Sequence, residues 1–211
     1  MSYLLRHLQS ETHQIRPYFT VPTNLISFKC TGVPKRERKT GKLFRAGNWD
    51  LPKSPLSKVQ QSDPRYLFYK EYFFENVSIE DTTAYAYHLG RQSRGTPRLG
   101  FESKERLVAQ LQGYVKLFRE IEKDGKVTPG YQLMGRRGNE IGCVIGRDGN
   151  IMKLAGGNNR FAIASLLQLP TVPIQVYFMH MDLLDEVVLT PGISPRQKIN
   201  RYLLDTISVK G

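Results

Sequence analysis

The chain contains little cysteine and no long apolar segment. Its 211 residues include two cysteines, Cys30 and Cys143, which are too few for a disulfide framework and are typical of a reducing compartment. Because no run of about 18 apolar residues is present, the sequence predicts no membrane-spanning helix. The first 15 residues lack the apolar core of a secretory signal. Together these absences predict a cytoplasmic protein without a membrane partner.

Acidic residues are scarce relative to basic ones. The 19 Asp and Glu residues face 31 Lys and Arg residues, which gives a formal net charge of +12 at pH 7. A basic surface attracts nucleic acid, nucleotides, acidic proteins or anionic membranes, and net charge alone does not distinguish them. The densest basic run is either a solvated loop or a surface for nucleic acid or phosphate. It consists of Lys35, Arg36, Arg38, Lys39, Lys42 and Arg45.

Several common catalytic and metal-binding motifs are absent. There is no C-x-x-C and no H-E-x-x-H, and the four histidines are scattered, so a zinc site is not expected. No G-x-S-x-G nucleophile elbow occurs. The glycines at 146 and 149 do not lead to the lysine and serine of a P-loop. These absences remove zinc hydrolases, α/β-hydrolases and P-loop enzymes from consideration.

The N-terminal half of the chain predicts irregular structure followed by helices. Residues 16–64 are rich in proline, glycine and basic residues, with one short strand expected at 25–29. Asp63 and Pro64 predict the start of a helix whose aromatic residues form part of the core. The spacing of Ser78 and Asp81 resembles a capping box that opens a helix to about residue 89.

The C-terminal half predicts an α+β fold. An apolar stripe over 103–124 predicts a long helix that ends at Gly125. It is followed by a strand at 141–146, a turn at 147–150, a strand at 151–155, a helix at 159–167 and a strand at 171–178. Ser194 and Pro195 predict a last helix. We therefore expect an N-terminal extension (1–102) that packs on the core, an α+β domain with a small mixed sheet (103–182) and a helical tail (183–211).

The clearest chemical signal is the segment Gly156-Gly157-Asn158-Asn159-Arg160, which we call the glycine turn. It joins a predicted strand to a predicted helix. A helix N-terminus offers backbone N–H groups and partial positive charge to an anion, and glycine lets the backbone approach a ligand closely. An asparagine can cap the helix, and Arg160 can bind phosphate through two parallel N–H groups. The glycine turn therefore predicts a phosphate-binding site, in which Arg160 could alternatively pair with a carboxylate.

Four short patterns over residues 118–180 resemble, in their order and spacing, the ParB/sulfiredoxin-like domain family. They are a helix end with Gly125 and Pro129 in a G-x-x-x-P pattern, an Asp-Gly turn at 148–149, the glycine turn with two alanines in its helix, and a closing V-P-x-x-V strand at 169–176. Residues 47–50 (Gly-Asn-Trp-Asp) and the segment around Tyr85 resemble elements of a bacterial branch of ParB-like proteins.

The resemblance implies a ParB/sulfiredoxin-like sheet that binds CTP, ATP or ADP at the glycine-rich helix start. Some members hydrolyse the nucleotide, some transfer a phosphoryl group, and ParB itself clamps DNA. Two positions depart from the pattern. Sulfiredoxins have a nucleophilic cysteine where this chain has Asn158, and other members have histidine or arginine where it has Asn159. Because asparagine does not titrate, these departures favour binding over catalysis.

Three residues are candidates for acid–base or metal chemistry. Glu140 precedes a strand, and Asp148 either holds a metal or forms an Asp-Gly turn. His180 ends the last strand, where the bacterial branch often has histidine. The carboxylates at 182, 185 and 186 have the oxygen chemistry that Mg²⁺ prefers. Arg136, Arg137 and Arg147 are further candidates for phosphate contact.

The sequence thus supports three functional hypotheses. The first is a nucleotide-binding protein that uses ATP or another nucleotide with Mg²⁺, either as a phosphotransferase or as a nucleotide hydrolase. The second is a non-catalytic nucleic-acid-binding protein of bacterial or phage origin that uses the basic run and the arginines at 91, 94 and 98. The third is a phage or mobile-element interaction protein with a degenerate pocket.

Overall fold

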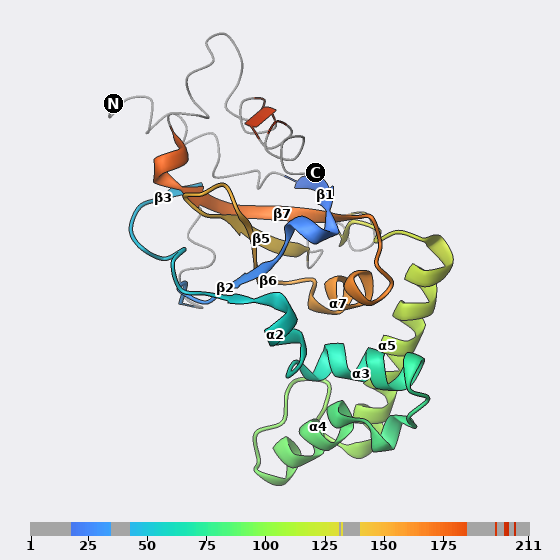
Figure 1. Ribbon diagram of the computed structural model, residues 1–211. Coiled ribbons are helices and arrows are strands. Elements are labelled where there is room, and N and C mark those ends of the chain that lie inside the picture. Colours follow the sequence, from blue (N-terminus) through green and yellow to red (C-terminus); the bar gives the residue numbers. More distant parts are fainter. Residues whose placement is uncertain are drawn as a thin grey trace. The chain divides into compact units, whose positions relative to one another are not determined.

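The computed structural model describes residues 18–34, 43–130, 132 and 140–184, together with residues 197, 201, 202 and 205. Over these residues the protein is a mixed α+β structure with seven strands in one mixed sheet and five α-helices, which confirms the expected class (Figure 1). The chain forms two compact units. The sheet unit comprises residues 1–56, 129–157 and 170–211, and the helical unit comprises residues 57–128 and 158–169.

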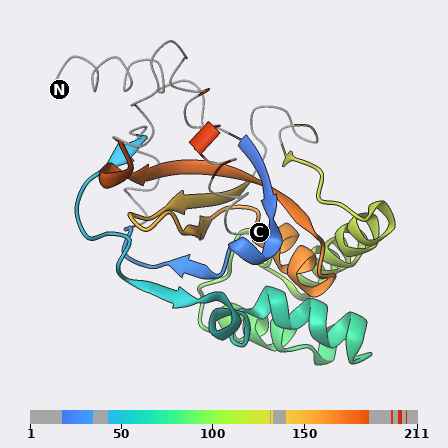
Figure 2. The ribbon, with the colours of Figure 1, turned by 45° about the horizontal axis from the view of Figure 1, so that its top comes forward.

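The sheet unit is built around strand β7, which covers Thr171–His180. The strand order is β1-β7-β5-β6-β2-β4, and β3 also pairs with β7 (Figure 2). The partners β3 and β5 run parallel to β7, whereas β1 runs antiparallel to it. The other strands are β1 (Tyr18–Pro22), β2 (Phe28–Cys30), β3 (Phe44–Arg45), β4 (Lys53–Pro55), β5 (Ile141–Ile145) and β6 (Ile151–Ala155).

Four of these strands come from the region that the sequence predicts as irregular. Strands β1 to β4 have two to five residues each, and β2 begins three residues after the start of the predicted strand at 25–29. Residues Thr23–Leu25 instead form a 3₁₀ helix, η1. Strands of two or three residues are too short to show an alternating pattern, so the sequence alone does not reveal them. Residues 18–55 therefore contribute directly to the same sheet as β5, β6 and β7.

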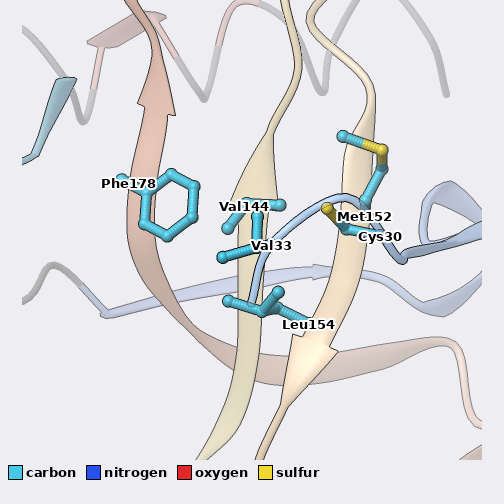
Figure 3. Packing of buried hydrophobic residues seen from close by; sticks show 6 residues of the cluster. All are labelled: Cys30, Val33, Val144, Met152, Leu154 and Phe178. Atoms are coloured by element: carbon cyan, nitrogen blue, oxygen red, sulfur yellow. The ribbon is translucent and has the colours of Figure 1, made fainter. Parts of the chain in front are cut away.

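The core of the sheet unit contains six buried side chains that gather on one face of the strands (Figure 3). Phe178 comes from β7, Val144 from β5, and Met152 and Leu154 from β6. Trp49 packs against this cluster and makes an edge-to-face contact with Phe178, with ring centroids 4.8 Å apart. The remaining members are Cys30 and Val33.

The helical unit begins with residues of α2 (Leu56–Gln60) and contains α3 (Pro64–Phe74), α4 (Thr83–Ser93), α5 (Lys104–Asp124) and α7 (Asn158–Leu166). Helix α7 packs on α3 and α5. Phe68 and Tyr69 of α3 and Phe118 of α5 are almost fully buried, which confirms them as core residues, whereas Phe74 at the end of α3 is 54% exposed. The rings of Tyr69 and Phe118 stack with centroids 5.9 Å apart.

Local signals predict most of the helix boundaries correctly. The Asp63 side chain accepts from the Arg65 backbone N–H at the start of α3, and Gly125 ends α5 in the left-handed region. The predicted helix start at Ser78 is wrong, because α4 begins at Thr83 with Thr82 as its cap. Residues Ile79–Asp81 form a short 3₁₀ helix, η3, in which the Ser78 hydroxyl donates to Asp81. The last predicted helix lies almost entirely outside the described residues.

The helices of the described segments are too short or too polar to cross a membrane.

Candidate functional site

The glycine turn begins with two consecutive glycines in the left-handed region. Gly156 has φ +68° and Gly157 has φ +52°, which other residues adopt only with strain. A side chain at Gly157 would also be obstructed, because its Cβ would lie 2.6 Å from the Ile141 backbone nitrogen in β5. Gly157 is therefore required by the packing of the sheet unit itself, independently of any ligand.

The start of α7 is electrostatically suited to an anion. Gly157 occupies the position before the helix and has no side chain that could cap it, and the first turn contains no acidic residue. The helices α3, α4 and α5 differ, since Asp63, Thr82 and Ser103 cap them with side-chain oxygens. Because the first turn of α7 contains no acidic residue, its backbone N–H groups and partial positive charge are attractive to a phosphate group.

Within the helical unit, the polar side chains of this first turn differ in their contacts. Arg160 is 8% exposed, and its Nη1 donates to the Thr128 carbonyl oxygen at 3.0 Å, so the guanidinium fastens α7 to the segment after α5. The Oδ1 atom of Asn159 is buried and has no hydrogen-bond partner among the described residues. A buried polar atom without a partner is costly, so a donor group that reached Asn159 would be stabilised there.

Two buried charged residues of the sheet unit lie beside the glycines. Glu140 is 2% exposed, and its Oε2 accepts from the Gly130 backbone N–H at 2.9 Å. Lys153 is also buried, and its Nζ donates to the Gly156 carbonyl oxygen at 2.6 Å. Lys153 is not among the predicted site residues, although a lysine in the otherwise apolar strand Ile151–Ala155 is a visible signal.

Cys143 pairs with Lys153 across β5 and β6. Burial raises the pKa of the Cys143 thiol to about 12, and the opposing effect of the nearby Lys153 ammonium is smaller. Because only the thiolate is a nucleophile, Cys143 does not act as a reactive cysteine at neutral pH.

His180 lies at the end of β7 and is 3% exposed. Its Nε2 lies 2.8 Å from the Gly47 carbonyl oxygen and its Nδ1 lies 3.2 Å from the Asp182 backbone nitrogen. The carbonyl needs a donor and the N–H needs an acceptor, so the neutral ring carries its proton on Nε2. Both ring nitrogens are thereby engaged by the protein's own backbone.

Asp50 is the carboxylate that pairs with Arg147 at this end of the sheet. Asp50 is 4% exposed, and its Oδ2 accepts from the Arg147 backbone N–H at 2.9 Å. The Arg147 side chain donates to the same carboxylate, from Nε to Oδ2 at 3.0 Å and from Nη2 to Oδ1 at 2.9 Å. Burial by itself would raise the pKa of Asp50, but the hydrogen bonds from Arg147 outweigh it and hold the value at about 2. Arg147 also donates to Gly47 and Asn48. This group of Asp50, Arg147 and His180, which we call the Asp50 cluster, fastens residues 47–50 to β7 and to the β5–β6 turn.

Asp148 is the central residue of the turn between β5 and β6. It accepts from the Asn150 backbone N–H at 3.1 Å and forms an ion pair with Lys53 at 3.0 Å. Burial opposes the charged form, but the hydrogen bond from Lys53 and those from Asn150 lower the pKa of Asp148. These contacts fit the turn interpretation of Asp148.

The structure does not bring the three candidate catalytic residues together. Ile141 of β5 pairs with Ile174 and Ile145 pairs with Met179, so Glu140 and His180 lie at opposite ends of the sheet. Six residues of strand separate these two levels, which corresponds to about 20 Å. Of the three, only Glu140 lies beside Gly157, whereas Asp148 and His180 belong to the end that holds Asp50.

Other predicted site residues fall partly outside the described residues. Arg45 is described, and its guanidinium lies over the Phe178 ring, 4.6 Å from the centroid. The described ranges contain no group of three or more His, Cys, Asp or Glu side chains that could hold a metal ion. The candidates that lie outside them are Lys35, Arg36, Arg38, Lys39, Lys42, Arg136, Arg137, Asp185 and Glu186.

Sequence reasoning did not identify Asp50 as an important charged residue. Asp50 and Arg147 are separated by 97 positions, and neither belongs to a periodic pattern. The available signal was the compact Gly-Asn-Trp-Asp segment itself, which combines turn residues with a tryptophan and a carboxylate.

We compared the chain with protein-family models, with curated proteins and with solved structures, and none of them matched. The resemblance to ParB/sulfiredoxin-like domains therefore stays a prediction that rests on the sequence patterns.

Proposed function

We propose that this chain binds a nucleotide through its phosphate groups at the first turn of α7. The observation that carries the proposal is a helix start that follows a glycine and contains no acidic residue. Backbone N–H groups and the helix dipole attract phosphate at such a position. The buried Oδ1 of Asn159 supports a ligand that also carries hydrogen-bond donors, as the ribose and base of a nucleotide do.

The geometry supports binding more strongly than catalysis. Phosphoryl transfer requires charge neutralisation and a positioned acid–base group at the phosphate. His180 and Asp148 lie at the far end of the sheet, in contact with other residues. Glu140 belongs to the sheet unit, where its backbone lies beside Gly157 and its Oε2 accepts from the Gly130 backbone N–H. Mg²⁺ would accompany ATP on its phosphate oxygens, since its coordination is usually shared between phosphate, water and a few carboxylates.

The test is calorimetric titration of ATP, CTP and ADP, each with Mg²⁺, into the wild type and into Asn159→Asp. A carboxylate in the first turn of a helix is stabilised by the helix dipole, so the variant should fold. The same carboxylate repels phosphate, so the variant should bind the nucleotides at least tenfold more weakly. Gln112→Glu on the exposed face of α5 adds the same charge elsewhere in the helical unit and should bind like the wild type. Absence of binding by the wild type, or equal loss in both variants, contradicts the proposal.

A second variant keeps the test informative if Asn159→Asp is unstable. Arg160→Lys retains a cation but loses the planar guanidinium that donates to Thr128. We expect it to weaken nucleotide binding while the far-ultraviolet circular dichroism spectrum remains that of the wild type. Unchanged affinity in a folded Arg160→Lys protein shows that the Arg160 guanidinium does not contribute to phosphate binding.

A second candidate function is nucleic-acid binding by the sheet unit. The sheet unit contains 18 Lys and Arg against 9 Asp and Glu, a net charge of +9, whereas the helical unit contains 13 against 10, a net charge of +3. The basic run of residues 35–45 belongs to the sheet unit. Reversing the charges of Lys35, Arg36 and Lys39 should weaken nucleic-acid binding and leave nucleotide binding unchanged.

A further inference from the structure

Three arginines of the helical unit lie at the end of α4 and in the loop that follows it. Arg91 is in the last turn, Arg94 is the C-cap residue, and Arg98 is in the loop that follows. The loop is held in place, because Arg91 Nε donates to the Thr96 carbonyl at 2.9 Å and the Thr96 N–H donates back to the Arg91 carbonyl at 3.0 Å. We call Arg91, Arg94 and Arg98 the α4 arginine surface.

No carboxylate within the described part of the chain forms an ion pair with these three arginines. The acidic residue that follows them in sequence, Glu102, accepts instead from Arg106 at 3.2 Å and from the Gly100 N–H at 2.9 Å. Arg65 of the same unit, by contrast, is paired with Asp63 at 2.7 Å. Arg94 and Arg98 are both exposed. The α4 arginine surface therefore presents uncompensated positive charge to solvent.

Buried His88 lies near two of the three arginines, Arg91 and Arg98. It is 3% exposed, its ring stacks on Phe101 with centroids 3.9 Å apart, and its Nδ1 has no hydrogen-bond partner among the described residues. Burial, followed by the positive charges of Arg98, Arg91 and Arg65, lowers the pKa of His88 to about 4. His88 is therefore neutral at physiological pH, and the positive charge of this surface comes from the arginines.

Two apolar side chains accompany the α4 arginine surface. Leu99 is 94% exposed in the loop, and Tyr87 of α4 is 41% exposed. Membrane-surface helices instead present a continuous apolar face, which a single leucine and a half-exposed tyrosine do not provide. Exposed arginines with an accessible aromatic ring are typical of surfaces that contact nucleic acid.

We propose that the α4 arginine surface binds the phosphate backbone of nucleic acid. The planar guanidinium group matches phosphate geometry and forms paired N–H···O contacts with it. Contacts to the phosphates of a nucleic acid fix the position of the protein on it without distinguishing its base sequence. The surface lies within the helical unit, and the proposal does not depend on the nucleotide site or on the basic run at 35–45.

The test uses fluorescence anisotropy with a labelled 20-base-pair DNA duplex and the same sequence as RNA, at several salt concentrations. The variant is Arg94→Gln with Arg98→Gln, because neither side chain has an ion-pair partner among the residues that the structure describes. The matched control is Arg119→Gln with Lys123→Gln, which removes two exposed charges of α5 in the same unit. Both variants lose the same net charge, so only a local site distinguishes them.

We expect the α4 variant to bind about tenfold more weakly, with a salt slope of log K that is smaller by about 2, since each duplex phosphate contact contributes about 0.9. The α5 control should bind like the wild type. Equal losses in both variants, or an α4 variant that binds like the wild type, would overturn the proposal. Binding only to vesicles that contain 30% phosphatidylserine, with no binding to DNA or RNA, would also overturn it.

Discussion

Arg147 in the sheet unit and the α4 arginine surface in the helical unit illustrate two uses of the same side chain. Arg147 donates to Asp50, Gly47 and Asn48, and the carboxylate that it contacts is buried. Arg94 and Arg98 are exposed and have no carboxylate partner among the described residues. The first arrangement fixes a loop against a sheet, whereas the second leaves positive charge for a partner.

This comparison shows what a sequence count of basic residues leaves undecided. Both regions contribute to the net charge of +12, but only the partners in the fold separate an arginine that stabilises from one that binds. Removing a charged side chain of the Asp50 cluster should therefore lower the stability of the fold. Removing arginines of the α4 arginine surface should instead weaken ligand binding. The following predictions test that difference, from the largest expected effect on stability to the smallest.

Asp50→Ala should destabilise the protein by about 3 kcal/mol, because it removes the carboxylate that pairs with Arg147 and leaves the guanidinium without a counter-charge. The measurement is urea unfolding followed by circular dichroism. Asp124→Ala, at the exposed end of α5, is the control and should change stability by less than about 0.5 kcal/mol. Equal effects of the two substitutions would show that the Asp50 cluster does not stabilise the fold.

Acid should remove the contribution of Asp50. Its pKa is about 2 in the folded protein and 3.8 in its ordinary state, so the folded state favours the carboxylate. The sign follows from linkage: the stabilisation, about 2 kcal/mol, is present above pH 3.8 and is lost as the pH falls toward 2. Unfolding free energies of the wild type and Asp50→Asn should therefore converge as the pH falls through this range. A constant difference would contradict the pKa shift.

His88 should titrate near pH 4 in the folded protein, compared with an ordinary value of 6.5. Because the lowered pKa favours the neutral ring, the stability contribution of His88 is complete above about pH 6.5 and declines as the pH falls toward 4. Nuclear magnetic resonance of the ring protons measures the pKa directly. Arg98→Gln should raise the pKa of His88, through the loss of one nearby cation. An unchanged pKa would indicate that burial alone causes the shift.

Arg94→Gln with Arg98→Gln should leave stability within about 0.5 kcal/mol of the wild type, since exposed side chains without ion pairs contribute little to folding. Urea unfolding at neutral pH is again the measurement. A loss of 2 kcal/mol or more would place these arginines with Arg147 as structural residues and remove the contrast between the two regions.

The sequence predicted the parts of the fold that depend on neighbouring residues. The cap at Asp63, the long helix that ends at Gly125, and the strands around the 147–150 turn all follow from signals within a few positions. The short strands β1, β3 and β4 carry no such signal. They exist because β7 and β2 offer free edges, which is a property of the assembled sheet.

The candidate site likewise has features that the local sequence predicts and features that depend on contacts between distant residues. The composition of the glycine turn could be read directly from the sequence, including its junction with a helix. The distance between Glu140 and His180 depends on the parallel pairing of β5 with β7, and the burial of Asp50 depends on a contact across 97 positions. The three predicted catalytic residues therefore come from both ends of one sheet, although a single chemistry was expected of them.

The central claim is that an anionic ligand binds at the start of α7 and not at the Asp50 cluster. Titration of ADP with Mg²⁺ into ¹⁵N-labelled protein, followed by two-dimensional ¹H–¹⁵N spectra, tests it most directly. We predict that the amides of Asn158, Asn159, Arg160 and Phe161 show the largest shifts, while those of residues 147–150 do not change. Largest shifts at residues 147–150, or no shifts at millimolar ADP, would contradict the account.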